Sequence, residues 1–170
     1  AWASNRTGNY DIWVMDVSGK TKGGNKKNLS KHPKEDKSPA WQPPFGLKLV
    51  FESDRDGDSE IYVMGRDGGN VKQLTANVFV WDGHPTWSPD GKQIIYASSA
   101  SGSVQIHKRW MDTGETTILT NVQTGPHGIS WSPDGKHEAF FGTVQQGADY
   151  KADLPPPPAG AKRAAPAKVN

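Results

Sequence analysis

The chain has 170 residues, of which 34% are hydrophobic and 22% charged, and it carries a formal net charge of +2 at pH 7. This length suits one domain or two small ones, and no stretch reaches the roughly 20 apolar residues of a membrane-spanning helix. The absence of cysteine excludes disulfides, cysteine nucleophiles and thiolate metal sites.

The chain begins with a unit of about residues 1–30 that contains three short segments typical of strands. Trp2-Ala3-Ser4 matches the end of a second strand in the later units, and the phrase Ser4–Met15 carries a turn followed by a third strand. Lys27–Ser30 closes the unit as a fourth strand. We therefore expect this unit to lack its first strand and most of its second.

The second unit, about residues 38–75, repeats these phrases and adds what precedes them. A first strand ends at Trp41, and an alternation of apolar and polar residues from Leu47 to Glu52 indicates a second strand. The phrase Ser53–Met64 matches Ser4–Met15 of the first unit, and Lys72–Thr75 closes the unit. The pattern predicts four antiparallel strands.

The third unit, about residues 84–120, has the clearest copy of each phrase. Its predicted strands are Pro85–Trp87, Gln93–Ser98, a third strand around Ile106, and Thr117–Thr120. Between the first two strands, Pro-Asp-Gly supplies the residues that a tight turn requires.

The fourth unit, about residues 127–154, is incomplete. It has a strand ending at Trp131, a second at His137–Phe141, and a candidate third at Ala148–Leu154. Four prolines then begin a Pro/Ala-rich basic tail, residues 155–170, and proline cannot donate to a strand ladder. No fourth strand is expected here.

The spacing of the repeat predicts the fold. Trp41, Trp87 and Trp131 are 46 and 44 residues apart, and the last two each begin the phrase Trp-Ser-Pro-Asp-Gly-Lys. Four antiparallel strands in about 45 residues are typical of one β-propeller blade. We predict an all-β, partial β-propeller of three to four blades, incomplete at both ends.

These phrases, together with Gly68-Gly69-Asn70 and Gln73-Leu74-Thr75, resemble the WD-like repeat of the TolB-type β-propeller family from residue 1 to about 154. The resemblance implies a propeller and a periplasmic or extracellular location. Relatives in this class include the partner-binding TolB propeller, propellers that gate serine peptidases, and pectin-fragment lyases. Because one fold hosts many functions, the resemblance alone does not select among them.

Three functions are consistent with the sequence. The first is a non-enzymatic interaction scaffold that binds a protein partner through rim loops at 77–84 and 120–128. The second is a self-assembling subunit, a dimer or filament, that completes blades between chains. The third is an accessory propeller domain of a hydrolase or lyase. No Gly-x-Ser-x-Gly elbow, phosphate loop or His-Glu-x-x-His motif is present, so we expect no enzymatic activity and no cofactor.

The candidate binding residues are Trp81, Asp82, His84 and His127. Trp81 and Asp82 fall in an expected loop between blades. There Trp81 is either exposed, which suits partner binding, or partly buried over the neighbouring blade. The two histidines precede the tryptophans of adjacent blades, and there they either hold a metal or anion or form hydrogen bonds within a polar tunnel or loop.

Two other patterns receive a structural interpretation. Trp2, Trp13, Trp41, Trp87 and Trp131 occupy repeat positions, which predicts packing between blades. Asp54, Asp56, Asp58 and Glu60 resemble the first half of a calcium loop, but the glycine comes too early and the distal glutamate is absent. Since every unit has a turn here, we predict a turn and no metal.

The basic segment from Lys20 to Lys37 lacks the interleaved aromatics of a nucleic-acid site, so no nucleic-acid partner is expected.

Overall fold

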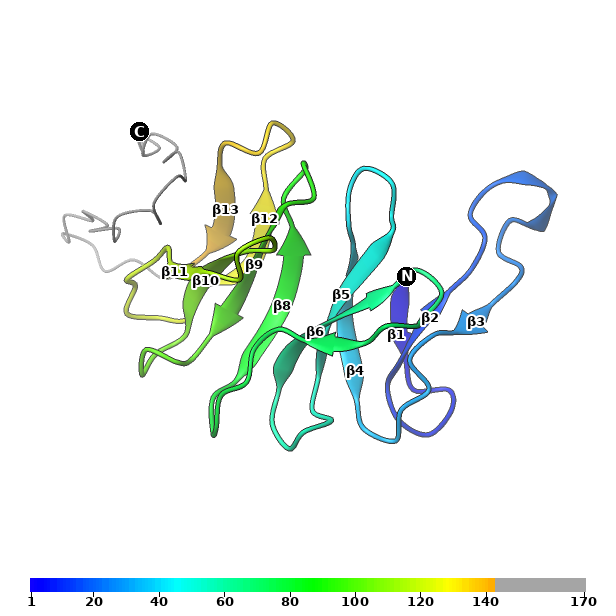
Figure 1. Ribbon diagram of the computed structural model, residues 1–170, viewed down its shortest axis with the longest axis horizontal. Coiled ribbons are helices and arrows are strands. Elements are labelled where there is room, and N and C mark those ends of the chain that lie inside the picture. The colour runs from blue at the N-terminus through cyan, green and yellow to red at the C-terminus, as the bar shows by residue number, and fades with distance from the viewer. Residues whose placement is uncertain (143–170) are drawn as a thin grey trace.

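The computed structural model describes residues 1–142 as four antiparallel sheets that follow one another along the chain (Figure 1). The first sheet contains β1 (Trp2–Ser4), β2 (Asp11–Val14) and β3 (Lys27–Asn28), with a 3-10 turn at Gly19–Thr21 between β2 and β3. The second contains β4 (Asp36–Trp41), β5 (Lys48–Ser53), β6 (Glu60–Gly65) and β7 (Lys72–Gln73). The third contains β8 (Asp82–Trp87), β9 (Gln93–Ser98), β10 (Gln105–Trp110) and β11 (Thr116–Ile118), and the fourth contains β12 (His127–Trp131) and β13 (Glu138–Phe141).

Within each sheet the strands pair with their neighbours in chain order. This succession of two four-stranded meanders, flanked by a three-stranded and a two-stranded sheet, confirms the predicted partial propeller. The third strand predicted at 148–154 and the tail at 155–170 lie outside the described residues. No helix within residues 1–142 is long and apolar enough to cross a membrane.

The core lies between successive sheets, so the second sheet is buried on both faces. One cluster joins the first and second sheets through residues that include Ile12, Leu49 and Phe51. A second cluster joins the second and third sheets and includes Val50 and Ile94. Alternate residues of β5 therefore face opposite neighbours, as the period-two geometry of a strand requires. In the sequence, the continuous apolar run Leu49–Phe51 is typical of a strand that is buried on both faces. A strict alternation of apolar and polar residues would indicate burial on one face only.

A hydrogen bond repeated in three sheets explains why the fourth strands are short. The N–H of the isoleucine in the third strand donates to a hydroxyl of the closing phrase, at 3.0 Å for Ile12–Ser30, 2.8 Å for Ile61–Thr75 and 2.9 Å for Ile106–Thr120. The preceding leucine N–H donates to the carbonyl of the same isoleucine, for example Leu74 to Ile61 at 2.8 Å. The Leu-Ser/Thr ending therefore caps the third strand and then directs the chain to the next sheet.

The innermost strands β4, β8 and β12 each contain a register shift at the same repeat position. The residues there have left-handed φ angles of 52° at Ser38, 53° at His84 and 63° at Gly128. Such bulges bend a strand and redirect a side chain. The first strand of the third unit is longer than predicted, because it begins at Asp82 and passes through the bulge before Pro85.

Candidate functional site

The segment between β7 and β8 presents the most exposed apolar side chains near the lower edge of the molecule in Figure 1. In this rim loop, residues 77–81, Phe79 is 97% exposed and Val78 is 77% exposed. Phe79 also has a left-handed φ of 60°. That conformation costs a non-glycine residue about 1–2 kcal/mol. The loop therefore holds an aromatic ring in water in a strained conformation.

Both ends of the rim loop are fixed by hydrogen bonds to the neighbouring strands. At the start, the backbone N–H of Asn77 donates to Glu60 Oε1, and its side-chain amide donates to Asp82 Oδ2 at 3.0 Å. At the end, Trp81 N–H donates to Ser99 Oγ at 2.9 Å, and Ser99 N–H donates to the Trp81 carbonyl at 3.0 Å. The tip at Val78 and Phe79 is thus supported by a rigid base.

Two buried acids form that base. Glu60 begins β6, Asp82 begins β8, and both are fully buried. Burial raises the pKa of Glu60 to about 7, the negative charge of Asp82 adds to this, and hydrogen bonds from Thr75 and Asn77 act in the opposite direction. Glu60 Oε2 and Asp82 Oδ1 have no hydrogen-bond partner. Asp82 therefore anchors the loop from inside, whereas the sequence predicted it as an exposed binding residue.

Trp81 and His84 lie beside each other at the base of the loop. Their rings meet edge-on with centroids 5.5 Å apart, and Trp81 is half-buried. A Cβ atom on Gly83 would lie 2.3 Å from Trp81 Cζ2, so the indole ring covers this glycine. His84 is exposed on the bulge of β8 and reaches toward β4, where Ser38 Oγ lies 3.4 Å from its Nδ1.

Ser38, Glu52 and His84 carry the residue types of a nucleophilic triad, but their arrangement differs from one. In a triad the imidazole stands between the hydroxyl and the carboxylate. Here Ser38 Oγ donates to Glu52 Oε2 at 3.2 Å, and Glu52 accepts the backbone N–H of His84 at 3.3 Å. The carboxylate therefore supports the bulge and does not orient the histidine ring.

His127 occupies a different position from His84. It begins β12, one residue before the bulge, so it corresponds to Gly83 and not to His84. Its exposed ring lies 5.8 Å from that of Phe141. Because adjacent strand residues point to opposite faces, the two histidines do not occupy equivalent positions. Their predicted pairing at a metal or anion stays a prediction, and the structure gives each of them another aromatic neighbour.

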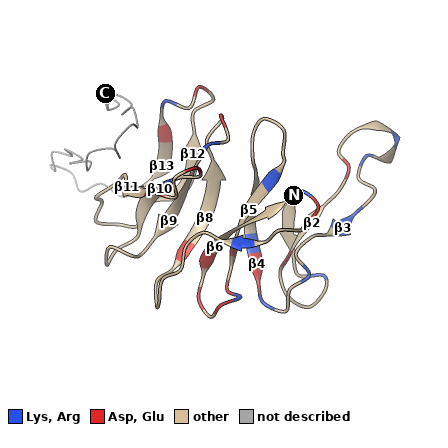
Figure 2. Cartoon of the chain, in the orientation of Figure 1, with Lys and Arg blue, Asp and Glu red and all other residues tan. Residues whose placement is uncertain are grey.

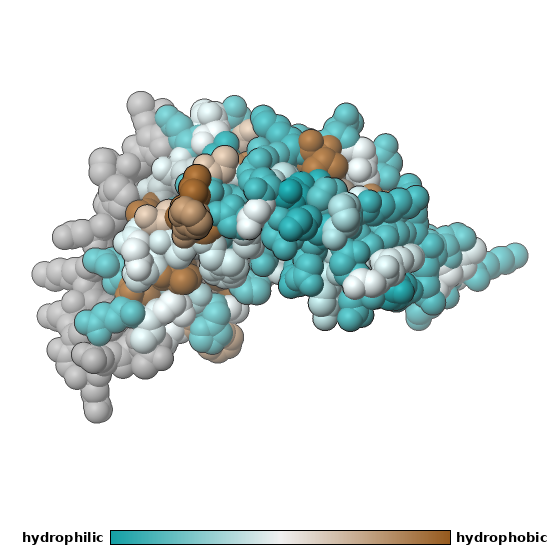
Figure 3. Space-filling view, turned by 90° about the horizontal axis from the view of Figure 1, so that it is seen from below, coloured by the Kyte–Doolittle hydropathy of each residue, from teal (hydrophilic) through white to brown (hydrophobic). Residues whose placement is uncertain are grey.

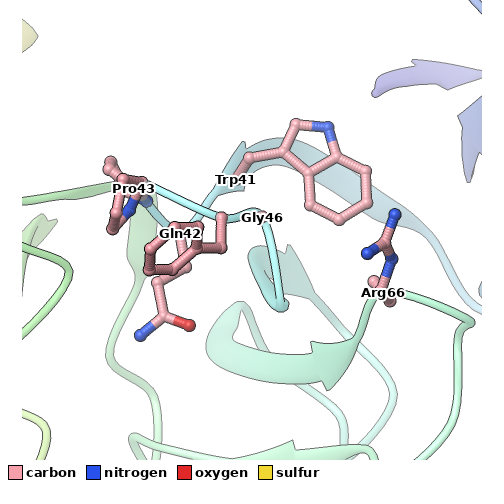
Figure 4. Close-up of a pocket in the computed structure, with 7 residues that line it drawn as sticks. Trp41, Gln42, Pro43, Gly46 and Arg66 are labelled. Atoms are coloured by element: carbon pink, nitrogen blue, oxygen red, sulfur yellow. The ribbon is translucent and has the colours of Figure 1, made fainter.

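A second exposed apolar feature lies at the opposite end of the sheets. A hollow of about 410 Å³ is formed by the turn between β4 and β5, and its lining includes Trp41, Pro43, Phe45 and Arg66 (Figure 4). Trp41 is 36% exposed and faces this turn. Trp41 was predicted to pack between blades, and part of its ring is instead exposed beside Gln42–Gly46, which stands in place of the Ser-Pro-Asp-Gly turn. The equivalent Trp87 is buried, as predicted.

Charged residues of both signs are spread over the molecule (Figure 2). Several acidic residues lie at the lower edge in this view, around the β5–β6 turn and at the starts of β6 and β8, where Glu60 and Asp82 are buried. The surface seen from below is mostly hydrophilic, with separate hydrophobic groups (Figure 3). The exposed tip of the rim loop thus lies beside an acidic region.

The sequence pointed to the rim loop but not to Phe79, which is its most exposed residue. Trp81 was the expected contact residue, whereas Phe79 is the exposed one. The available signal was the apolar run Val78-Phe79-Val80, which stands in a segment without strand pairing.

Comparisons with known proteins agree with this architecture. The family model described as the TolB beta propeller domain matches residues 1–151. An uncharacterized peptidase of Bacillus subtilis, YuxL, is 32% identical over 127 residues, which cover 74% of this chain and 18% of that protein. A TolB homolog of Chlorobaculum tepidum is 35% identical over 89 residues, or 52% of this chain and 19% of the homolog.

Among solved structures, TolB from Acinetobacter baumannii superposes with a TM-score of 0.69 at 26% identity, covering 88% of this chain and 36% of that one. The chain spans about a fifth of the length of the two curated relatives that it matches.

Proposed function

Because the chain belongs to the TolB β-propeller family, we propose that it is a non-enzymatic interaction module that binds a protein partner through the rim loop. The supporting observation is Phe79, which is 97% exposed in a strained conformation on a loop held at both ends. Strain of this kind is typical of functional segments. A preorganised aromatic side chain is also a common anchor of binding energy at protein interfaces.

Phe79 is the proposed anchor, and its neighbours form the rest of the contact surface. Val78 adds apolar area beside it, and Trp81 and His84 border it with amphipathic rings. The imidazole can donate or accept a hydrogen bond at the polar edge of such an interface, and the indole N–H can donate one. The partner segment that this surface suits is an apolar or aromatic one, because Phe79 and Val78 are the most exposed side chains of the loop.

The experiment is a selection of binding peptides from a displayed library on the 170-residue chain, followed by affinity measurements on variants. We expect Phe79→Ala to weaken the selected peptides by more than 30-fold, which corresponds to the roughly 2 kcal/mol of an interface anchor. Phe45→Ala is the matched control, since it truncates another exposed phenylalanine at the opposite end of the sheets.

The affinities of the two variants show whether the peptides bind at the rim loop. Loss of affinity in Phe79→Ala and retention in Phe45→Ala would support the rim loop as the binding site. Peptides that bind Phe79→Ala as tightly as the unmodified chain would contradict it.

We propose a periplasmic or extracellular location for this activity, in line with TolB relatives. Cell fractionation of the source organism with an antibody to the chain tests this location. Recovery in the cytoplasmic fraction would contradict it.

The second candidate function is that of a propeller domain of a peptidase. The observation in its favour is the 32% identity with the Bacillus peptidase, which extends over 74% of this chain. Sequencing the gene on both sides tests this candidate. A hydrolase domain in the same reading frame would support it, and stop codons that exclude such a domain would contradict it.

A further inference from the structure

The turn between β5 and β6 brings three acids together. Asp56, Asp58 and Glu60 each offer a carboxylate oxygen, and these three oxygens lie within 4.8 Å of one another. Two oxygens bound to one calcium ion at 2.3–2.6 Å stand at most about 5 Å apart, so the observed spacing suits a calcium shell. Magnesium demands a near-ideal octahedron and keeps several of its waters, so a shell of protein carboxylates suits it less well than it suits calcium.

Glu60 gives this cluster an observation beyond its acidity. Its side chain is fully buried, yet Oε2 has no hydrogen-bond partner. Its other oxygen, Oε1, accepts the backbone N–H of Asn77. A buried carboxylate oxygen without a donor is rare in folded proteins and calls for an ion, a water molecule or a proton.

Protein cations near the cluster are engaged elsewhere. The guanidinium of Arg55, which precedes Asp56, pairs with Asp36 at 2.8 Å. Within residues 1–142, the ion pairs include none with Asp56, Asp58 or Glu60. The donors to Asp56 are neutral groups, the side-chain amide of Gln73 and the hydroxyl of Tyr62. The negative charge of the cluster is therefore left without a neutralising side chain.

In the equivalent turns of the flanking sheets, a hydrogen-bond donor of the turn itself binds the acceptor side chains, so no ion is needed there. In the first sheet the counterparts of Asp56 and Glu60 are Thr7 and Asp11, and the Thr7 hydroxyl donates to Asp11 at 2.6 Å. In the third sheet the Gln105 amide donates to the Ser103 hydroxyl at 2.9 Å. Only the second of these three turns carries acceptors alone at all three positions, so it lacks the internal donor that its neighbours have.

We propose that Asp56, Asp58 and Glu60 form a calcium-binding site at the β5–β6 turn. All three ligands are oxygen donors, which calcium prefers, and no nitrogen or sulfur ligand is present. The ion would bring the two more accessible aspartates together with the buried glutamate and would satisfy Glu60 Oε2. None of the three ligands belongs to the rim loop itself, but Glu60 also accepts the backbone N–H of Asn77, so the site adjoins the base of that loop.

The test is calorimetric titration of calcium chloride into the 170-residue chain, after removal of metals with a chelating resin. We expect one equivalent to bind with a dissociation constant of roughly 10⁻⁴–10⁻³ M, the range of extracellular calcium modules. The double variant Asp56→Asn/Asp58→Asn should bind at least tenfold more weakly. Asp112→Asn is the control, since it neutralises an exposed turn aspartate of the third sheet.

The asparagine variants preserve side-chain shape, and unfolding curves in EDTA will establish that they remain folded. Titration with magnesium chloride provides the second arm, and we expect it to be at least tenfold weaker. Three results would overturn the proposal: no calcium binding at 5 mM, equal calcium binding by the double variant, or equal binding of magnesium. The first of these would leave a proton shared with Asp82 as the partner of Glu60 Oε2.

Discussion

The side-chain amide of Asn77 donates a hydrogen bond of 3.0 Å to Asp82 Oδ2. Through its backbone N–H the same residue also bonds to Glu60. One residue therefore ties the third strand of the second sheet to the first strand of the third sheet. This connection fixes the start of the rim loop and keeps its tip exposed.

Removal of this connection should destabilise the fold. Asn77→Ala leaves Asp82 with two buried oxygens that lack a donor, so we expect the free energy of unfolding to fall by about 1–3 kcal/mol. Urea denaturation measures the change. Asn121→Ala, which truncates an exposed loop asparagine, should change the free energy by less than about 0.5 kcal/mol. Equal effects of the two substitutions would contradict the anchoring role of Asn77.

The strain at Phe79 predicts opposite effects on stability and binding. Phe79→Gly removes the steric cost of the left-handed φ, and the unfolded-state entropy of glycine offsets part of this gain. We expect the free energy of unfolding to stay unchanged or rise by up to about 1 kcal/mol. Peptide binding should be lost in the same variant. A loss of more than about 1 kcal/mol in stability would mean that the ring packs within the fold.

In the first three sheets, a hydroxyl of the closing phrase accepts the N–H of the isoleucine in the third strand. Of these hydroxyls, that of Thr75 gives the clearest prediction. Thr75→Val keeps the shape of the side chain but leaves the buried N–H of Ile61 without its acceptor. The expected cost is about 1–3 kcal/mol in the free energy of unfolding. Faster hydrogen exchange of the Ile61 amide should accompany it. Thr117→Val in β11 serves as the control, and a similar loss there would argue against a specific cap.

Stability should depend on pH through His107 of β10. The ring is buried beside Tyr96, and this burial lowers the pKa of His107, while the charge of Asp82 acts in the opposite direction. The folded pKa lies below the unfolded value of about 6.5, so the unfolded chain binds more protons as the pH falls. The stabilising contribution is therefore present above about pH 6.5 and is lost below it, by at most about 1.4 kcal/mol per pH unit.

Denaturant unfolding between pH 7.5 and pH 5 measures this dependence. Glu60, whose pKa is raised to about 7, gives the folded chain an extra proton in the same range and so opposes this loss. Compared with the unmodified chain, His107→Phe should lose less stability as the pH falls, because it removes the titrating imidazole and keeps an aromatic ring beside Tyr96. An unchanged slope in this variant would assign the pH dependence to other groups.

The repeat was sufficient to predict the sheets, because each phrase contains its own strand period and turn residues. The Trp87 phrase, for instance, placed β8 and β9 on either side of their turn. Sequence could not predict which way Trp41 would face, since its exposure depends on the turn formed by Gln42–Gly46. It also missed the approach of Glu60 to Asp82, because these acids come from different repeats and meet only when the sheets stack.

For the candidate site, the sequence predicted the loop but not which of its side chains would be exposed. The loop before His84 was identified from its aromatic content, and Trp81 was expected to be either exposed for binding or partly buried over the neighbouring blade. Trp81 is half-buried, whereas Phe79, which was not singled out, is exposed. Which ring faces water is decided by the left-handed turn at Phe79 and by the close approach of Trp81 to Gly83. Both are properties of the folded backbone and cannot be inferred from residue type.

Partner binding at the rim loop can be located by two-dimensional NMR of the labelled chain, titrated with a peptide selected on it. We expect the largest amide shifts within residues 77–84 and around Ser38, with little change at residues 41–47. Shifts centred on residues 41–47, with the rim loop unaffected, would contradict it.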